Sequence, residues 1–302
     1  MTNPKQRLLG TIMFLAFAFS LTGAKAETQP STYERVVTSK TLRCGYLPYE
    51  PYISVDPNTG EVSGITHDYF ESVAQRNGFK IEWAQDVNID QLVPTIESGK
   101  IDAACIPATP DENWEQVLDF PAYLGSLPYF IYVPKDSTLN KEQLDKARFA
   151  TQDGFALTDI TKNAFPDAIY IGLTQTASTA ELYDQLKYKK TDALVNEHIS
   201  ASLYMKNNPD VIRRFSDTPV IAMRMFMLSK KGDKEMTDFL DKTFNVDIPE
   251  NLAVMKEILK KNKMEKGSLF LGEECIKPET TEKGWRICEQ PTPPETIEKE
   301  KK

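Results

Sequence analysis

Three tyrosines and two prolines share the seven-residue stretch YLPYEPY, residues 46–52. Proline fixes φ and removes a backbone donor, so this stretch cannot form a helix or a central strand. A tyrosine on such a loop either packs over the protein's own core or presents its ring to a ligand. We predict that Tyr49 faces a ligand and that Tyr52 is structural.

Other groups that could do chemistry are sparse. A carboxyl group and an imidazole are neighbours in the chain at Glu197 and His198, and the only other histidine is His67. No nucleophile–base set, phosphate-binding loop or Cys-x-x-Cys cluster accompanies them. We therefore predict ordinary polar contacts for the two histidines, and no catalytic residue, metal ion or cofactor.

The first half of the chain alternates between predicted strands and helices. Buried or alternating apolar patterns predict strands at 41–47, 79–84 and 101–106, and helical spacing predicts helices at 68–77 and 89–100. Strands that alternate with helices at this spacing indicate parallel βαβ units, and hence an α/β fold.

A second strand–helix series follows, although no internal repeat is evident in the sequence. Its strands are predicted at 147–151, 168–172 and 191–195, with helices at 178–187 and 199–206. The remaining predicted elements are two strands, 129–133 and 220–229, and two helices, 234–244 and 249–260.

Four loops follow the carboxyl ends of predicted strands: 46–52, 107–114, 152–157 and 196–200. In open parallel sheets, ligands bind beyond the carboxyl ends of the strands. The sequence therefore predicts that these loops face one another across a cleft, with the tyrosines of the first loop at its mouth.

Residues 1–26 have the pattern of a secretory signal peptide. Lys5 and Arg7 precede an apolar run, and the small-residue sequence Ala-Lys-Ala ends at Ala26. We expect an exported protein, located in the periplasm where the cell has an outer membrane. The net charge is −8 and becomes more negative by three when Lys5, Arg7 and Lys25 are removed. An acidic chain without a basic stripe argues against binding to nucleic acid or to anionic membranes.

Four cysteines follow the signal: Cys44, Cys105, Cys275 and Cys288. An even number in an oxidising compartment favours disulfides, with three possible pairings. A bridge from Cys275 to Cys288 would close a short loop in the C-terminal segment 266–302, which is rich in Glu, Lys, Pro and Thr and which we expect to be partly disordered. A bridge from Cys44 to Cys105 requires neighbouring strands, as the predicted fold provides, and two buried free thiols are the alternative.

An ordered series of motifs over residues 41–263 resembles the family 3 solute-binding proteins, the periplasmic receptors of polar amino-acid ABC transporters. The motifs are LRCGYLPYEPY, GEVSGITHDYF, LVPTIESGKIDAA, VLDFPAYLGSLPYFIYV, KYKKTDALVNE and MFMLSKKGD.

The resemblance implies the type II periplasmic binding fold, in which two αβ lobes joined by two hinge strands close on a ligand. Lobe 1 would comprise 41–130 plus 222–265, and lobe 2 would comprise 131–221. The hinge strands would lie near 129–133 and 221–227.

The family's binding residues match this sequence only in part. The resemblance places a stacking aromatic at Tyr49, a carboxylate-binding hydroxyl at Thr109 and the acid that pairs with the ligand ammonium at Glu197. The second stacking position is Ile89, and the arginine that grips the ligand carboxylate falls on Trp114, which cannot replace it.

An acid without its partner arginine suits an amine or another cationic group, held with help from aromatic rings. The predicted ligand-binding residues are Tyr46, Tyr49, Ile89, Thr109, Trp114, Gly154, Phe155 and Glu197.

The function implied is capture of a small polar, amino-acid-like or amine-bearing solute by a monomer that delivers it to an inner-membrane ABC permease. One alternative is an accessory protein for a periplasmic quinoprotein dehydrogenase, because Ile106-Pro107-Ala108 is similar to a loop of such relatives. A second alternative is an enzyme like the cyclohexadienyl dehydratases, which would need Glu197 as a general acid with a raised pKa.

Overall fold

The computed structural model describes residues 30–110, 113–264, 267–271, 277–280 and 286–289. The predicted signal peptide, 1–26, lies outside the described residues. Within the described ranges, no helix is both long enough and apolar enough to cross a membrane.

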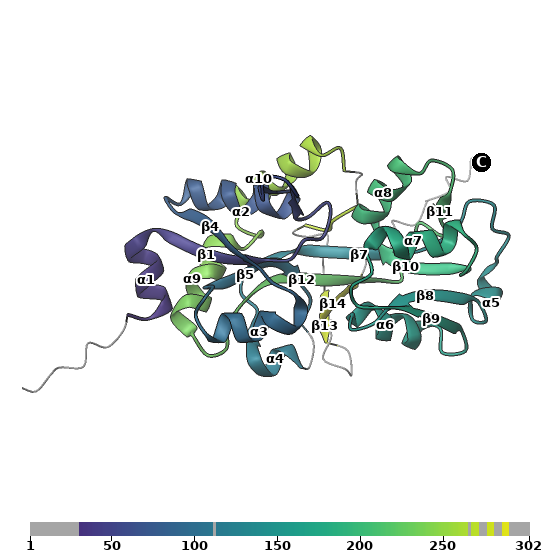
Figure 1. Ribbon diagram of the computed structural model, residues 1–302, viewed down its shortest axis with the longest axis horizontal. Helices are drawn as coiled ribbons and strands as arrows, with labels where there is room; N and C mark the ends of the chain where they lie inside the picture. The colour runs from purple at the N-terminus through teal and green to yellow at the C-terminus, as the bar shows by residue number, and fades with distance from the viewer. Residues whose placement is uncertain (1–29, 111–112, 265–266, 272–276, 281–285, 290–302) are drawn as a thin grey trace, which may run out of the picture.

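Two αβ lobes lie side by side and share one continuous mixed sheet (Figure 1). The strand order is β4 (Lys80–Asp86), β1 (Thr41–Tyr46), β5 (Ala103–Ala108), β12 (Ile221–Lys230), β7 (Tyr123–Pro134), β10 (Ala193–Glu197), β8 (Arg148–Gln152) and β9 (Ile169–Leu173). This two-lobed α/β architecture confirms the predicted fold class.

The two strands in the middle of this order, β7 and β12, run from one lobe into the other (Figure 1). β12 pairs with β5 of lobe 1, and it pairs antiparallel with the first half of β7. The second half of β7 pairs instead with β10 of lobe 2, where Tyr129 is opposite Glu197. Every residue of β7 is buried, including Gly125 and Ser126, and the strand is longer than the predicted 129–133.

Lobe 1 is built around α2 (Ile65–Arg76), which buries Tyr69, Phe70, Val73 and Ala74 at helical spacing. The hydroxyl of Tyr69 donates a hydrogen bond of 2.7 Å to the carbonyl of Phe244, which joins α2 to another helix of the lobe. The other helices of this lobe are α1 (Thr32–Ser39), α3 (Ile89–Glu97), α4 (Trp114–Val117), α9 (Lys234–Phe244) and α10 (Pro249–Lys261).

Lobe 2 packs its helices around β10, β8 and β9 (Figure 1). Ser178 and Glu181 form a capping box at the start of α7 (Thr179–Lys187), as the sequence pattern S-x-x-E predicts. The remaining elements of this lobe are α5 (Lys141–Leu144), α6 (Ala156–Ala164), α8 (His198–Asn207) and β11 (Ile212–Arg214).

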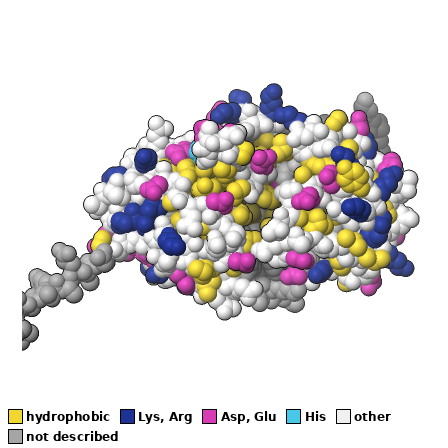
Figure 2. All heavy atoms as spheres, viewed as in Figure 1, with side chains coloured by type: hydrophobic (Ala, Val, Ile, Leu, Met, Phe, Trp, Pro, Cys, Tyr) yellow, Lys and Arg dark blue, Asp and Glu magenta, His cyan; other side chains and the backbone are white. Residues whose placement is uncertain are grey.

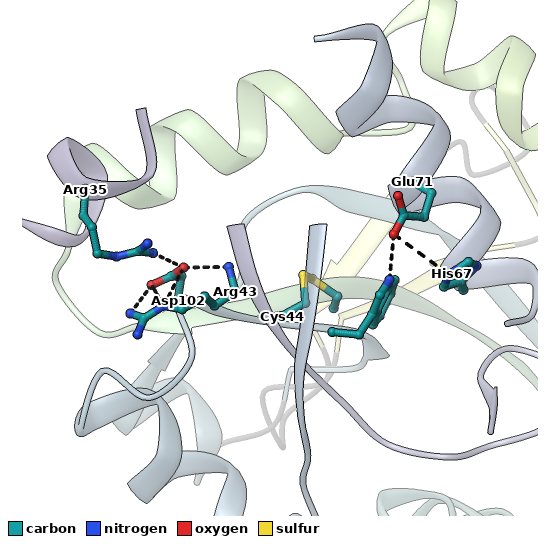
Figure 3. Close-up of a disulfide and its surroundings, with 8 residues drawn as sticks. Arg35, Arg43, Cys44, His67, Glu71 and Asp102 are labelled. Atoms are coloured by element: carbon teal, nitrogen blue, oxygen red, sulfur yellow. Dashed lines mark hydrogen bonds and ion pairs between the residues drawn. A yellow bond between two sulfur atoms is a disulfide. The ribbon is translucent and has the colours of Figure 1, made fainter. Parts of the chain in front are cut away.

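A buried aspartate in lobe 1 holds two arginines in place (Figure 3). Asp102, just before β5, accepts a hydrogen bond of 2.7 Å from the backbone N–H of Arg43. It also forms an ion pair of 2.7 Å with the guanidinium of Arg43. Arg35 of α1 binds the same carboxylate, whose side chain is fully buried. In this way Asp102 joins α1 to the sheet.

The same device recurs in lobe 2. Asp192, just before β10, accepts a hydrogen bond of 3.0 Å from the backbone N–H of Arg148. It also forms an ion pair of 2.7 Å with the guanidinium of Arg148. The guanidinium of Arg148 lowers the pKa of Asp192 below its ordinary value. The two lobes therefore repeat a structural device that their sequences do not make obvious.

A disulfide joins Cys44 on β1 to Cys105 on the neighbouring strand β5, with the two Cα atoms 5.5 Å apart (Figure 3). This pairing confirms the prediction that the two cysteine-bearing strands are neighbours. A bridge that spans 61 positions stabilises a fold by about 4 kcal/mol in the chain-entropy account. The predicted Cys275–Cys288 bridge lies outside the described residues, because Cys275 is not described.

Part of the C-terminal segment lies against the hinge strands. Phe270 exchanges two backbone hydrogen bonds with Ser126 of β7, and Leu269 is buried next to Gly125. Farther along the chain, Ile287 pairs with Met223 of β12. The short strands not yet named are β2 (Ser54–Val55), β3 (Val62–Ser63), β6 (Leu118–Asp119), β13 (Lys277–Thr280) and β14 (Arg286–Glu289).

Candidate ligand-binding site

A cavity of about 240 Å³ lies between the two lobes, lined by residues of both lobes and of the hinge strands. Figure 2 shows hydrophobic side chains gathered around the hollow in the middle of the molecule, with acidic side chains near its rim. A concave, mostly apolar cavity of this size between two lobes suits a small solute.

All four predicted loops contribute to this cavity. Seven of the eight predicted binding residues line it: Tyr49, Ile89, Thr109, Trp114, Gly154, Phe155 and Glu197. The eighth, Tyr46, is not among the lining residues and instead packs edge-on against Trp83, with their ring centroids 6.0 Å apart. That these residues bind a ligand remains a prediction.

Among these seven cavity-lining residues, Glu197 is buried and held by several hydrogen bonds. It is the last residue of β10 and the N-cap of α8, and it is only 1% exposed. Its Oε2 accepts hydrogen bonds from the N–H of Ile199 (2.6 Å) and of Ser200 (3.0 Å), and its Oε1 accepts another from Ser200 (3.0 Å). The helix thereby satisfies two of its free N–H groups with a carboxylate, which its dipole also favours.

Burial raises the pKa of Glu197 above its ordinary value, although the hydrogen bonds from Ser200, Tyr52 and Ile199 oppose this effect. The desolvated carboxylate therefore favours a partner that supplies positive charge or a further donor.

Tyr49 and Tyr52 line the cavity from lobe 1. A backbone bridge between Tyr49 and Ile53 closes the first loop into a tight turn, and the rings of Tyr49 and Tyr52 stack with centroids 5.8 Å apart. The hydroxyl of Tyr52 donates a hydrogen bond of 3.1 Å to Oε2 of Glu197. Burial, followed by the charge of Glu197, raises the pKa of Tyr52, so the phenol keeps its proton at neutral pH.

Tyr52 is thus buried, as expected of a structural residue, but it also lines the cavity and contacts the central acid. Sequence reasoning also missed Tyr129 of β7, which lines the cavity beside Met223 and Met225 of β12. These side chains belong to strands whose apolar sequences are typical of a buried core. The only indication in the sequence that they border a cavity was the assignment of both strands to the hinge.

The charge of the lining is the most informative feature of the cavity. Among the described residues that line it, Glu197 is the only one with a carboxylate, and none has a basic side chain. The polar remainder consists of hydroxyls and amides, and most other lining side chains are aliphatic or aromatic. On lobe 2 the polar lining residues include Thr151, Gln152, Thr158, Thr161 and Asn196, and the apolar ones include Leu157.

Neither histidine lines this cavity. The ring of His198 is buried within lobe 2, where its Nδ1 lies 2.9 Å from the hydroxyl of Tyr132. His67 lies on lobe 1, where its Nδ1 is 3.2 Å from the carboxylate of Asp68. Its Nε2 is 3.9 Å from the carboxylate of Glu71, as Figure 3 shows. Both make the ordinary polar contacts that we predicted.

Comparison with known proteins agrees with this architecture. The model of the family described as bacterial extracellular solute-binding proteins, family 3, matches residues 42–260. A "Probable histidine-binding protein" of Campylobacter jejuni is 25% identical over 260 residues, which cover 84% of this chain and 98% of that protein. The "Arginine-binding extracellular protein ArtP" of Bacillus subtilis is 23% identical over 209 residues, covering 68% of this chain and 78% of ArtP.

Solved structures share the fold at lower identity. A mutant of ArgBP from T. maritima has a TM-score of 0.60 at 21% identity, covering 76% of this chain and 98% of that chain. The periplasmic VFT2 domain of BvgS from Bordetella pertussis has a TM-score of 0.63 at 18% identity, covering 75% of this chain and 96% of that chain. With its two lobes, its interlobe cavity and a family match over most of its length, the chain belongs to family 3 of the bacterial extracellular solute-binding proteins.

Proposed function

We propose that this protein captures a small amino-acid-like or amine-bearing solute in the cavity between its lobes. One observation carries the proposal: a buried carboxylate, Glu197, is the only charged side chain among the described residues that line the cavity. An isolated charge is costly to bury, so a site of this kind favours a ligand that brings the opposite charge.

The relatives support an amine-bearing ligand. Two curated relatives are named for binding histidine and arginine, both of which carry an ammonium group. Both names describe binding proteins, and we propose that this chain likewise binds its solute without transforming it.

The two hinge strands offer the means of capture. Within the described residues, β7 and β12 are the only strands of the shared sheet that pass from one lobe to the other. A small conformational change in these two strands would therefore open or close the cavity. We propose that the closed form delivers the solute to an inner-membrane ABC permease. The protein would act as a monomer in the periplasm, after removal of the predicted signal peptide.

A thermal-shift screen of the purified protein against amino acids, amines, quaternary ammonium compounds and organic acids tests this function. A solute present at a hundred times its Kd adds about 2.7 kcal/mol to stability and should raise the Tm by roughly 5–10 °C. We expect stabilisation by one or more amine-bearing solutes. No stabilisation by any compound of the screen would contradict the proposed function.

A further inference from the structure

We infer that the ligand is a small organic amine without a carboxylate, held by its ammonium group rather than by both ends of an amino acid. This inference rests on the proposed function and names the chemical class of its ligand. It follows from three observations: the position of every described arginine side chain, the ability of the Glu197 carboxylate to accept a further hydrogen bond, and the apolar character of most of the remaining lining.

Every arginine with a described side chain is engaged away from the cavity. Arg35 and Arg43 bind Asp102, Arg76 binds Asn251, Arg148 binds Asp192, Arg213 binds the carbonyl of Ser137, and Arg214 and Arg224 lie over Phe130 and Tyr123. None of these arginines lines the cavity, and none of the described lysines does.

Arg224 lies between two residues that line the cavity. Met223 and Met225 line the cavity, but successive residues of a strand face opposite sides of the sheet. Arg224 accordingly lies on the other face, with its guanidinium 4.5 Å from the ring centroid of Tyr123 and 5.2 Å from that of Phe226. It therefore cannot serve as a carboxylate anchor without leaving both rings.

A carboxylate buried in this cavity would lack a cationic partner and would also lie near the negative charge of Glu197. Both effects oppose binding, because an unpaired buried charge loses its hydration without compensation. An amino acid should therefore bind less tightly than the amine that remains when its carboxylate is replaced by hydrogen.

An ammonium group finds the opposite environment. Each oxygen of a carboxylate offers about two acceptor positions. Oε2 of Glu197 accepts hydrogen bonds from Ile199, Ser200 and Tyr52, whereas Oε1 accepts one from the N–H of Ser200, which leaves Oε1 a position for a further donor. The rings of Tyr49, Tyr52 and Tyr129 line the same cavity, and ring faces attract a desolvated cation. Side chains such as Leu47, Ile89 and Phe155 can then cover the apolar body of the ligand.

Matched compounds that differ in one group test this inference by isothermal titration. Four pairs compare an amino acid with its decarboxylated amine: histidine with histamine, arginine with agmatine, phenylalanine with phenethylamine, and leucine with isopentylamine. Two neutral alcohols, 2-phenylethanol and isopentanol, have the carbon skeletons of phenethylamine and isopentylamine but carry a hydroxyl in place of the ammonium group.

We expect at least one amine to bind ten-fold or more tightly than its parent amino acid, a difference of about 1.4 kcal/mol, and more tightly than the alcohol of the same body where one exists. Tighter binding by the amino acids would overturn the inference while leaving the proposed function intact.

Equal binding of an amine and its alcohol would overturn the inference in a different way, since the cation would then not be the anchor. Absence of binding by every compound would overturn both the inference and the proposed function. The exposed acid Glu235, which does not line the cavity, provides a control: Glu235→Gln should reproduce the wild-type order of affinities.

Discussion

The phenol of Tyr52 donates a hydrogen bond of 3.1 Å to the carboxylate of Glu197, and the two residues are 145 positions apart in the chain. Tyr52 follows β1 in lobe 1, and Glu197 ends β10 in lobe 2. The bond therefore joins the lobes directly across the ligand cavity, and it couples the ionisation of the central acid to the relative position of the lobes.

Tyr52→Phe removes this interlobe bond. A hydrogen bond to a charged group is worth about 1.5–3 kcal/mol, so we expect the free energy of unfolding to fall by that amount in urea titrations. Because the bond favours the ionised form of Glu197, its loss should raise the pKa of Glu197 further and weaken the binding of an amine.

Tyr204→Phe is the matched control, since the hydroxyl of Tyr204 also donates to a carboxylate, that of Asp184, at 2.6 Å. Tyr204 does not line the cavity, so its substitution should lower stability without changing ligand affinity. Unchanged amine affinity in Tyr52→Phe as well would show that the interlobe bond has no part in binding.

The raised pKa of Glu197 predicts a pH dependence of stability without ligand. The folded protein holds this proton more tightly than the unfolded chain does. The resulting stabilisation is fully present below the unfolded pKa and is lost as the pH rises through the folded pKa. Glu197→Gln has no proton to lose.

The stability of Glu197→Gln relative to wild type should therefore increase as the pH is raised from about 4 to 7. Urea unfolding at several pH values measures this difference, with Glu235→Gln as the reference variant. A difference that stays constant over the range would mean that the folded and unfolded pKa values of Glu197 are the same.

The two aspartate–arginine devices should differ in energetic importance. Asp102 is fully buried at its side chain and binds two arginines, whereas the side chain of Asp192 is 33% exposed and binds one. Breaking a buried pair leaves uncompensated charge, so Asp102→Asn should cost about 3–5 kcal/mol of unfolding free energy. Asp192→Asn should cost about 1 kcal/mol, because solvent screens the exposed pair. Equal losses in urea titrations would contradict the importance of burial here.

The C-terminal segment against the hinge gives a fourth prediction. Leu269 is 9% exposed and packs on Gly125 of β7, so Leu269→Ala should lower the free energy of unfolding by about 2–4 kcal/mol. Leu139→Ala, at a half-buried position in lobe 2, should cost less.

Truncation of the C-terminal segment follows the same reasoning. A chain that ends at Leu271 should keep the contacts of Leu269 and Phe270 with β7 and lose only the pairing of Ile287 with β12. A chain that ends at Lys263 should lose both sets of contacts and be measurably less stable. Equal stability of the two truncated chains would show that residues 267–271 do not support the hinge.

Much of this fold could be predicted because its strands are short buried runs bounded by turn residues. β1, β5 and β10 lie within two residues of their predicted starts, since short apolar runs are distinctive, and proline-containing loops follow the first two of them. The helix α6 was not predicted. Its N-cap is Phe155, without a capping side chain, so the usual start signal is absent.

The site was predicted less completely than the fold. The loops that carry Tyr49 and Glu197 could be located because ligands bind beyond the carboxyl ends of parallel strands, and the family resemblance pointed to these two residues within the loops. The contact between Tyr52 and Glu197 could not, because it depends on how closely the two lobes approach. Tyr129 was missed for a similar reason, since a continuously apolar strand does not reveal which of its faces borders a cavity.

The central claim is that Glu197 anchors an ammonium group between the lobes. Its most direct test is isothermal titration of the tightest-binding amine of the matched series into wild type, Glu197→Gln and Glu235→Gln at neutral pH. The account predicts that Glu197→Gln loses at least ten-fold in affinity, about 1.4 kcal/mol, while Glu235→Gln binds like wild type. Equal affinities in all three proteins would contradict it.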